Sequence, residues 1–387
     1  MTTGLATSAP LAGNAQNQPE ALRQRSEFRN LLPLTKFYST PNPLPPRAPG
    51  TLIRSEEFYE YQLPEGISAI RILYYSRSAR GGDVAASGVV LIPDHPPPAH
   101  GWPVIAWAHS FIGTARQCAP SLMRNLNEGP FLSMYVKLGY AVVAADYAGL
   151  GTDFRNASVD MQSNATDVIY SITAARAAVP QLGRKWVAIG ESAGGQAALA
   201  VAELEEEIRD RDYLGSIAIS GVADSREFYE QVARTDSMDG LLFLAYGIQT
   251  VYPAFQPNQM LTSEGLPVSE QTESSCAANV SGLAPANRAL KPDWENNYFV
   301  RQFFARNLLG KKPAYGPLLI ISSYADPAVR TGMTLRAVKR MCKQGDAVQF
   351  HQYQGSDFAA VLGDSVRDQL TWIQERFEGR RASSNCY

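Results

Sequence analysis

The stretch Trp186-Val-Ala-Ile-Gly190-Glu-Ser192-Ala-Gly194 decides how this chain of 387 residues folds. Its first four residues are apolar, which is typical of a short strand buried on both faces. The Ala-rich segment 193–204 follows directly and predicts a helix. Between strand and helix the chain must reverse sharply, and small residues such as Gly190 and Gly194 relieve the crowding there. The pattern therefore predicts a tight strand-to-helix corner with Ser192 at its tip.

Apolar runs on both sides of this corner extend the pattern into a sheet. We predict short strands at 71–75 and 86–92, and buried strands at 104–108, 141–145, 216–219, 318–321 and 348–353. Helical spacing of apolar residues lies between and after them, over 168–175 and 366–377. Strands that alternate with helices predict a mostly parallel sheet flanked by helices. With a serine corner at its centre, this arrangement is the α/β-hydrolase fold.

One connection is much longer than the others and predicts a cap. Residues 224–314 separate the strands 216–219 and 318–321 by about 90 positions, where a few residues suffice. The segment carries many aromatic residues, so it is not a disordered linker: Phe243, Tyr246, Tyr252, Phe255, Tyr298, Phe303 and Phe304. We expect a helical cap at 224–314, inserted before the acid-bearing strand, on a core made of 51–223 and 315–380. Residues 1–50, rich in Pro, Asn, Gln and Ser, are expected to form a disordered or extended arm.

The overall composition narrows the classes of partner. Hydrophobic residues make up 45% of the chain and charged residues 19%, which is typical of a globular protein with a sizeable core. The formal net charge is −2 and no basic stripe is present, so we do not expect nucleic acid as a partner. The sequence contains no run of about 18 apolar residues, so we expect no membrane span. A small-molecule ligand is the expected partner.

The cysteines and the N-terminus bear on the compartment. Cys118, Cys276, Cys342 and Cys386 are scattered, without a Cys-x-x-Cys pair. Their spacing predicts no metal site, and we expect no cofactor. One or two disulfides stay open as an alternative for an exported protein. Residues 1–19 show neither the basic nor the apolar region of a secretory signal, so we predict a cytoplasmic location.

The corner itself predicts nucleophilic chemistry. A serine in this position stands at the carboxyl end of the sheet, against a helix N-terminus that favours developing negative charge. The backbone N–H of Ala193 is one expected donor of an oxyanion hole. The second donor should come from the loop after an earlier central strand. The loop that begins at His109 fits this place, and the N–H of Ser110 or Phe111 is the candidate.

The predicted triad has an acid but no obvious base. Asp326 follows the strand 318–321 and is expected to be the acid. The histidine of the triad should follow the last strand, yet 355–359 reads Gly-Ser-Asp-Phe-Ala. Of the four histidines, His109 is expected to lie nearest to Ser192 and is the remaining candidate base, whereas His351 is expected to be a hydrogen-bonded strand residue. A serine hydroxyl without a base is a weak nucleophile at neutral pH.

At these residues the chain resembles the secretory lipase family of capped α/β-hydrolases, over about residues 37–378. The matching segments are Phe37-Tyr38, Pro49-Gly50-Thr51, Ala106-Trp-Ala-His109, Cys118-Ala-Pro-Ser121, Asp146-Tyr147, Gly149-Leu-Gly151, the serine corner, the Asp326 turn and Asp368 to Phe377. The resemblance implies a capped fold and an acyl-ester pocket. It also implies that the family's catalytic histidine aligns with Phe358. Ser110 stands where the family usually has glycine.

Three functions are compatible with these features. The first is a serine-type hydrolase for a carboxylic ester or acyl substrate, esterase-like, lipase-like or an acyltransferase, with an atypical triad that lacks the usual histidine. The alternative is a repurposed α/β-hydrolase fold in a biosynthetic pathway, acting as a lyase, cyclase or isomerase. The third is a catalytically inactive binding protein. The aromatic-rich cap favours an apolar acyl or polyketide-like substrate.

Overall fold

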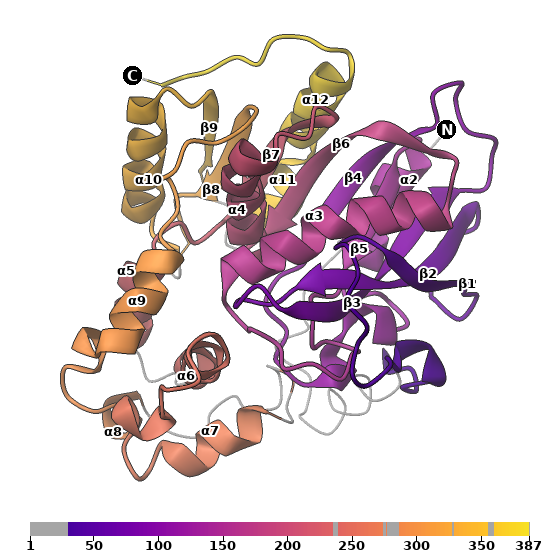
Figure 1. Cartoon of the computed structure of the whole chain (residues 1–387). Helices are drawn as coiled ribbons and strands as arrows, with labels where there is room; N and C mark the ends of the chain where they lie inside the picture. The colour runs from indigo at the N-terminus through magenta and orange to yellow at the C-terminus, as the bar shows by residue number, and fades with distance from the viewer. Residues whose placement is uncertain are drawn as a thin grey trace, which may run out of the picture.

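The computed structural model describes residues 30–234, 239–273, 276, 286–326, 329–354 and 360–386. In this part of the chain, nine strands form one sheet in the order β1-β2-β3-β5-β4-β6-β7-β8-β9 (Figure 1). The strands are β1 (Leu52–Glu57), β2 (Ile67–Arg77), β3 (Asp83–Pro93), β4 (Trp102–Ala108), β5 (Ala141–Ala145), β6 (Leu182–Glu191), β7 (Tyr213–Ile219), β8 (Leu318–Ser323) and β9 (Val348–Tyr353).

The sheet is parallel from β5 to β9 and antiparallel from β1 to β3. Strand β3 also pairs antiparallel with β5, which joins the two parts. The predicted mostly parallel sheet is therefore confirmed. The sequence patterns located the parallel strands well but missed β1, whose residues are only half-buried or exposed and so show no apolar run. The buried strands lie in the middle, as apolar runs should.

Helices cover both faces of the sheet. On one face lie α3 (Met161–Ala178), α4 (Ala193–Ile208) and α10 (Thr331–Gln344), and on the other α2 (Gly129–Lys137), α11 (Ala360–Asp364) and α12 (Val366–Phe377) (Figure 1). Side chains of the central strands alternate between the two cores because successive residues of a strand point to opposite faces. Ala106 and Ala188 face α3 and α4, whereas Trp107 and Ile189 face α2 and α12.

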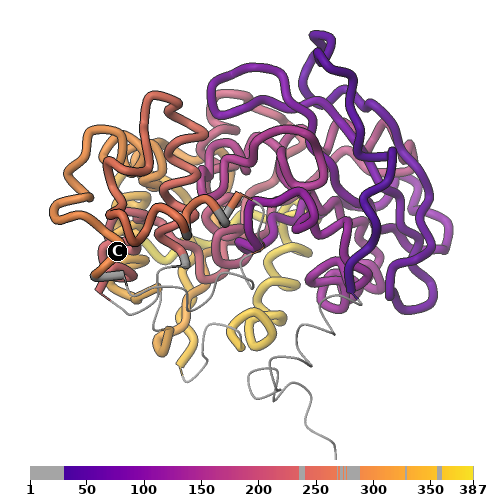
Figure 2. The backbone as a smooth tube through the Cα atoms, turned by 90° about the horizontal axis from the view of Figure 1, so that it is seen from below, coloured from indigo at the N-terminus to yellow at the C-terminus, as the bar shows by residue number. Residues whose placement is uncertain are grey.

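Helices also fill the long connection between β7 and β8. They are α5 (Ser225–Val232), α6 (Asp239–Val251), α7 (Leu266–Thr272), α8 (Ala286–Ala289) and α9 (Tyr298–Arg306). Short 3-10 turns complete the described chain: η1 (Lys36–Tyr38), η2 (Arg116–Cys118), η3 (Pro120–Leu122), η4 (Pro257–Gln259) and η6 (Trp294–Asn296). In Figure 2 the orange segments of this connection gather at one end of the molecule and the indigo N-terminal strands at the other.

The aromatic residues of this connection mostly belong to the core that also contains α3 and α4. Phe255 and Phe303 are fully buried, and Phe255 packs edge-on against Phe299. Phe243 on α6 is also buried and packs against Phe111, in the loop that follows β4. This contact ties the helices of the long connection to the loop in which we expect an oxyanion donor. We keep the name cap for residues 224–314, whose boundaries remain a prediction.

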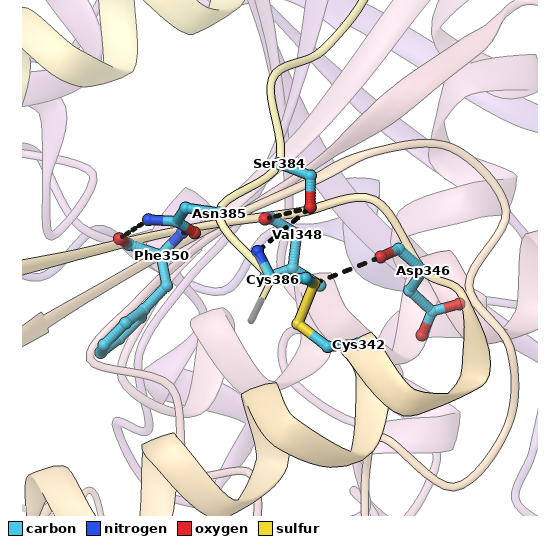
Figure 3. Close-up of a disulfide and its surroundings, with 7 residues drawn as sticks. All are labelled: Cys342, Asp346, Val348, Phe350, Ser384, Asn385 and Cys386. Carbon is cyan, nitrogen blue, oxygen red and sulfur yellow. Dashed lines mark hydrogen bonds between the residues drawn. A yellow bond between two sulfur atoms is a disulfide. The ribbon is translucent and has the colours of Figure 1, made fainter.

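Two disulfides join surface segments of the described chain to the rest of the protein. Cys118 pairs with Cys276, and Cys342 pairs with Cys386. The first joins the loop after β4 to the cap, where Gly113 and Cys276 also form an isolated β-bridge. The second joins the C-terminal tail to α10, next to the edge strand β9 (Figure 3). All four cysteines are thus paired, which the sequence left open.

The tail covers the open edge of the sheet beside this second disulfide. The N–H of Asn385 donates to the carbonyl oxygen of Val348, and its side chain bonds both the N–H and the C=O of Phe350 (Figure 3). An exposed edge strand offers unpaired backbone groups to other chains. The tail therefore satisfies part of that edge, which explains why a segment without a strong pattern is ordered.

Candidate active site

The backbone at Ser192 has the strained geometry that the sequence predicts. Its φ is +56° and its ψ is −121°, between the end of β6 and the first residue of α4. Such a conformation costs energy in a non-glycine residue and persists only where the surroundings enforce it. A Cβ on Gly190 would overlap the backbone of Gly194, and one on Gly194 would overlap the carbonyl oxygen of Ala108. Both glycines are therefore required by the close approach of β4, β6 and α4.

The Ser192 hydroxyl stands at the start of a 16-residue helix. The side chain is half-buried and makes no capping bond to the helix, and within the described chain it has no hydrogen-bond partner. The next N–H group, that of Ala193, is the first of α4. A helix N-terminus presents unpaired N–H groups and a positive partial charge. This arrangement suits a group on which negative charge develops beside Ser192.

The loop after β4 lies next to this corner. Strands β4 and β6 are parallel neighbours with Ala108 opposite Gly190, so the residues that follow them share one edge of the sheet. Glu128, just before α2, supports this loop by accepting bonds from the Trp107 indole (2.6 Å) and the Ser110 hydroxyl (3.3 Å). The backbone of Ser110 is thereby held beside the nucleophile corner. Its role as an oxyanion donor, like that of Ala193, stays a prediction.

His109 is buried in this loop and is held by main-chain atoms. Nδ1 lies 2.6 Å from the carbonyl oxygen of Ser110, and Nε2 lies 3.1 Å from that of Asp146. The ring stacks on Tyr147, with centroids 4.1 Å apart. Burial lowers the pKa of His109 to about 4, although both carbonyl contacts act in the opposite direction. These contacts give the ring a structural role, and its predicted role as the base gains no support from them.

Asp326 lies at the same edge of the sheet as Ser192. It follows β8, which is joined to β6 through the parallel strand β7. The carboxyl group is buried, and Oδ1 accepts the N–H of Val329 at 2.9 Å. Its charge contributes to the raised pKa of Glu191, which places the two carboxyl groups in one cluster. The position suits the predicted acid of the triad.

The two other residues that bear on the base lie along and after β9. His351 sits within β9, where Nδ1 contacts the Asp368 carboxylate at 2.5 Å and Nε2 contacts the Gln349 side chain at 2.9 Å. It is thus a hydrogen-bonded strand residue, as expected. Phe358 belongs to 355–359, outside the described residues. The same holds for 1–29, most of the predicted N-terminal arm.

Glu191 is the site residue that sequence reasoning missed. It ends β6 directly before the nucleophile, and only 7% of it is exposed. Burial raises its pKa to about 8, and the negative charges of Glu128 and Asp326 add to the shift. In the motif Gly-x-Ser-x-Gly the second residue was treated as a spacer. A carboxyl group inside an otherwise apolar buried strand was the signal that could have revealed it.

Two cavities frame the site without containing the hydroxyl. A small one lies beside Ala193 and is lined by His109, Phe111, Tyr147 and Asn164. A larger one of 520 Å³ lies between the β2–β3 hairpin, α3 and α6, with Asn164 on its wall too. Ser192 lines neither. Several arginine and aspartate side chains line the larger cavity, so it does not resemble an apolar acyl pocket.

Among the described residues, no group of three or more His, Cys, Asp or Glu side chains could hold a metal ion. Nor is any helix of the described segments long and apolar enough to cross a membrane.

A model of one protein family matches most of the chain. The family is described as secretory lipase, and the match covers residues 127–385, well over half of the sequence. The chain belongs to the secretory lipase family. It is accordingly a hydrolase-like enzyme, as predicted. No curated protein shows a significant match to it.

Solved structures with the same fold include lipases and esterases. Candida antarctica lipase A in its closed state superimposes with a TM-score of 0.78 at 17% identity, covering 92% of this chain and 89% of that one. The rice cell wall degrading esterase LipA from Xanthomonas oryzae has a TM-score of 0.72 at 19% identity, covering 87% of this chain and 100% of that one. At these identities the likeness shows the fold alone, and it confirms the predicted α/β-hydrolase fold.

The family corrects the predicted compartment. A secretory lipase acts outside the cytoplasm, so the prediction of a cytoplasmic location was wrong. The two disulfides agree with this correction, because disulfides persist in oxidising compartments and are rare in the cytosol. The prediction had depended on the composition of residues 1–19, whereas one or two disulfides had been left open as an alternative.

Proposed function

We propose that this member of the secretory lipase family hydrolyses carboxylic esters through Ser192. The observation that carries the proposal is the strained Ser192 corner, held by Gly190 and Gly194 at the N-terminus of α4. The hydroxyl oxygen attacks the acyl carbonyl carbon, and the amide N–H groups of Ala193 and of Ser110 or Phe111 stabilise the oxyanion. The alkoxide leaves, and water then hydrolyses the acyl-enzyme. Asp326 is the carboxylate of the site.

We further propose that the triad is atypical, with Phe358 at the position of the family's histidine. Three observations support this. Residues 355–359, which come after β9, contain no histidine. His351 is bound to Asp368 within β9, and both ring nitrogens of His109 face main-chain carbonyl oxygens. Removal of a triad member typically costs several orders of magnitude in rate, so slow turnover is expected.

The substrate that we propose is a small molecule with an apolar acyl or polyketide-like group. Membership of a lipase family supports an apolar ester. The partly buried ring of Phe111 and the buried ring of Tyr147 line a small cavity beside Ala193 and support an apolar contact for the acyl chain. The large cavity beside α3 is not assigned to this group, because arginines and aspartates line it.

Hydrolysis of p-nitrophenyl butyrate by wild type, Ser192→Ala and Ser220→Ala tests the proposal. Ser220 is the matched control, since it also has a positive φ (+48°) and directly follows the neighbouring parallel strand β7. We expect Ser192→Ala to lose at least about 100-fold in kcat/KM and Ser220→Ala to stay within about twofold. Equal rates in wild type and Ser192→Ala would remove the nucleophile role.

A second function is favoured by one observation. The Ser192 hydroxyl has no hydrogen-bond partner in the described chain, and no histidine nitrogen is directed to it there. A non-hydrolytic enzyme of a biosynthetic pathway, such as a lyase, cyclase or isomerase, would use the hydroxyl as a hydrogen-bond or proton donor. A folded wild-type protein without Ser192-dependent ester turnover would favour this alternative, or a binding protein, over the hydrolase.

A further inference from the structure

A buried carboxyl group stands directly before the nucleophile. Glu191 is the last residue of β6, and only 7% of it is exposed to solvent. Within the described chain its carboxyl group has no hydrogen-bond partner. Its neighbour Ser192 also lacks one for its hydroxyl. Consecutive Cα atoms are about 3.8 Å apart, so both residues belong to the same corner at the end of β6.

The sheet geometry shows where Glu191 points. Side chains alternate along a strand, so Glu191 shares its face with Ile189, which packs in the same core as Trp107 and α2. The Trp107 indole donates to Glu128, which therefore lies on this face as well. Asp326 approaches from β8 at the same edge. Glu191 thus faces the side from which a triad acid reaches the nucleophile.

The other carboxyl groups around the corner are all hydrogen-bonded. Glu128 accepts bonds from Trp107, Ser110 and Asn127. Asp326 accepts the N–H of Val329. A buried polar group without a partner costs free energy, and an apolar residue in the same place would avoid that cost. Glu191 differs from Glu128 and Asp326 because no described residue donates a hydrogen bond to its carboxyl group.

We propose that Glu191 is the proton acceptor that activates Ser192, directly or through one water molecule. This inference rests on the proposed ester hydrolysis. The Ser192 oxygen forms a bond to the acyl carbon while its proton passes to the Glu191 carboxylate. When the tetrahedral intermediate collapses, the acyl–oxygen bond breaks and the leaving alkoxide takes that proton. In the second half, water gives its proton to Glu191, attacks the acyl-enzyme, and the proton returns to the Ser192 oxygen as the acid leaves.

The charged surroundings suit this role. The titratable groups that face Glu191 are Glu128 and Asp326, which together with burial raise its pKa to about 8. His109, at the end of the neighbouring strand β4, is neutral because burial lowers its pKa to about 4. A general base works best when its pKa lies near the operating pH. The carboxylate form of Glu191 increases as the pH rises through 8, so the rate should rise over the same range.

The test compares pH profiles of kcat/KM for p-nitrophenyl butyrate in wild type, Glu191→Gln and Glu205→Gln. Glu205 is the matched control, since it is also buried, with a pKa raised to about 7, and lies on α4 away from the corner. We expect wild type to gain activity with a midpoint near pH 8. In Glu191→Gln, kcat/KM should fall at least about 100-fold and should no longer rise with pH. In Glu205→Gln, kcat/KM should stay within about twofold of wild type and should keep the rise.

A second background keeps the result interpretable. In Phe358→His the new imidazole takes over the proton, so the midpoint should move toward about 6.5, and Glu191→Gln should then cost less than about fivefold. If Glu191→Gln kept the turnover and the pH profile of wild type, the inference about Glu191 would be overturned, but the proposed function would not. Turnover that survives Ser192→Ala would instead defeat the proposed function. A folded Glu191→Gln protein is verified by its melting temperature, which should not fall.

Discussion

Two serines directly follow neighbouring parallel strands of the sheet, and only one of them has the surroundings of a nucleophile. Ser192 follows β6 with φ +56°, and Ser220 follows β7 with φ +48°. The N–H of Ser192 donates a hydrogen bond of 2.8 Å to the carbonyl oxygen of Ile219. The N–H of Ser220 donates one of the same length to the carbonyl oxygen of Ile321. The backbone of the two corners is therefore alike.

The two corners differ in how soon a helix begins after the serine. Helix α4 begins at the residue after Ser192, whereas α5 begins only at Ser225 and has its own cap, the Asp224 side chain. Ser220 is 1% exposed, and Ser192 is half-buried. A positive φ thus does not define a nucleophile by itself. The hydroxyl must also be accessible, and a helix N-terminus must begin directly behind it.

The largest effect should come from filling the Ser192 corner. In Gly194→Ala the new methyl group would overlap the carbonyl oxygen of Ala108, so β4, β6 and α4 could not pack as closely as they do. We expect a loss of about 3–5 kcal/mol in the free energy of unfolding, measured by urea denaturation.

The control is Gly363→Ala, where a Cβ would meet nothing within 4 Å. It should change the free energy of unfolding by less than about 1 kcal/mol. If Gly194→Ala were as stable as this control, the corner would be looser than the structure shows.

Removal of each disulfide in turn should have a smaller effect, and the two removals should differ in ester turnover. Cys118→Ser with Cys276→Ser removes the tie between the cap and the loop that follows β4, beside the corner. Cys342→Ser with Cys386→Ser only removes the link between the C-terminal tail and α10, at the edge of the sheet. Each pair should cost about 2–5 kcal/mol of stability, because the unfolded chain gains freedom. Ester turnover at a temperature where both variants are folded should fall about tenfold only for the first pair.

Equal activity in the two disulfide variants would show that the loop after β4 keeps its shape without the cap. The measurement is therefore paired, with thermal unfolding for stability and initial rates for function.

The smallest effect concerns His109. Its pKa is lowered to about 4 from the usual 6.5, so the unfolded chain binds this proton more readily. Its contribution to stability is complete above about pH 6.5 and is lost as the pH falls toward 4. Over this pH range the free energy of unfolding of wild type should fall by on the order of 2 kcal/mol more than that of His109→Gln. Denaturation curves at several pH values measure this difference. Parallel curves for the two proteins would mean that the imidazole is not buried as a neutral ring.

The sequence predicted those features that depend on local patterns. Apolar runs located the parallel strands, and Gly190 to Gly194 located the corner, because small residues and a buried strand follow directly from steric and hydrophobic requirements. Strand β1 was missed because its half-exposed residues show no apolar run. The pairing of Cys118 with Cys276 joins residues 158 positions apart, which no local pattern reveals. The wrong compartment resulted instead from the composition of residues 1–19.

The site was predicted less completely than the fold. Ser192 and Asp326 could be placed because each follows a recognisable strand. The contacts of His109 depend on the carbonyl oxygen of Asp146, which belongs to a different strand end, so its engagement was not visible in the sequence. Glu191 was overlooked because burial, not spacing, distinguishes it. Properties that arise from packing between distant segments were the ones that needed coordinates.

Mapping of a covalent adduct tests the central claim most directly. The protein is treated with a fluorophosphonate at pH 8, digested, and the modified peptide is identified by mass spectrometry. The account predicts one phosphonyl group on the peptide that spans β6 and α4, attached to Ser192. An adduct on Ser220 or elsewhere, or a folded protein that stays unmodified, would contradict it.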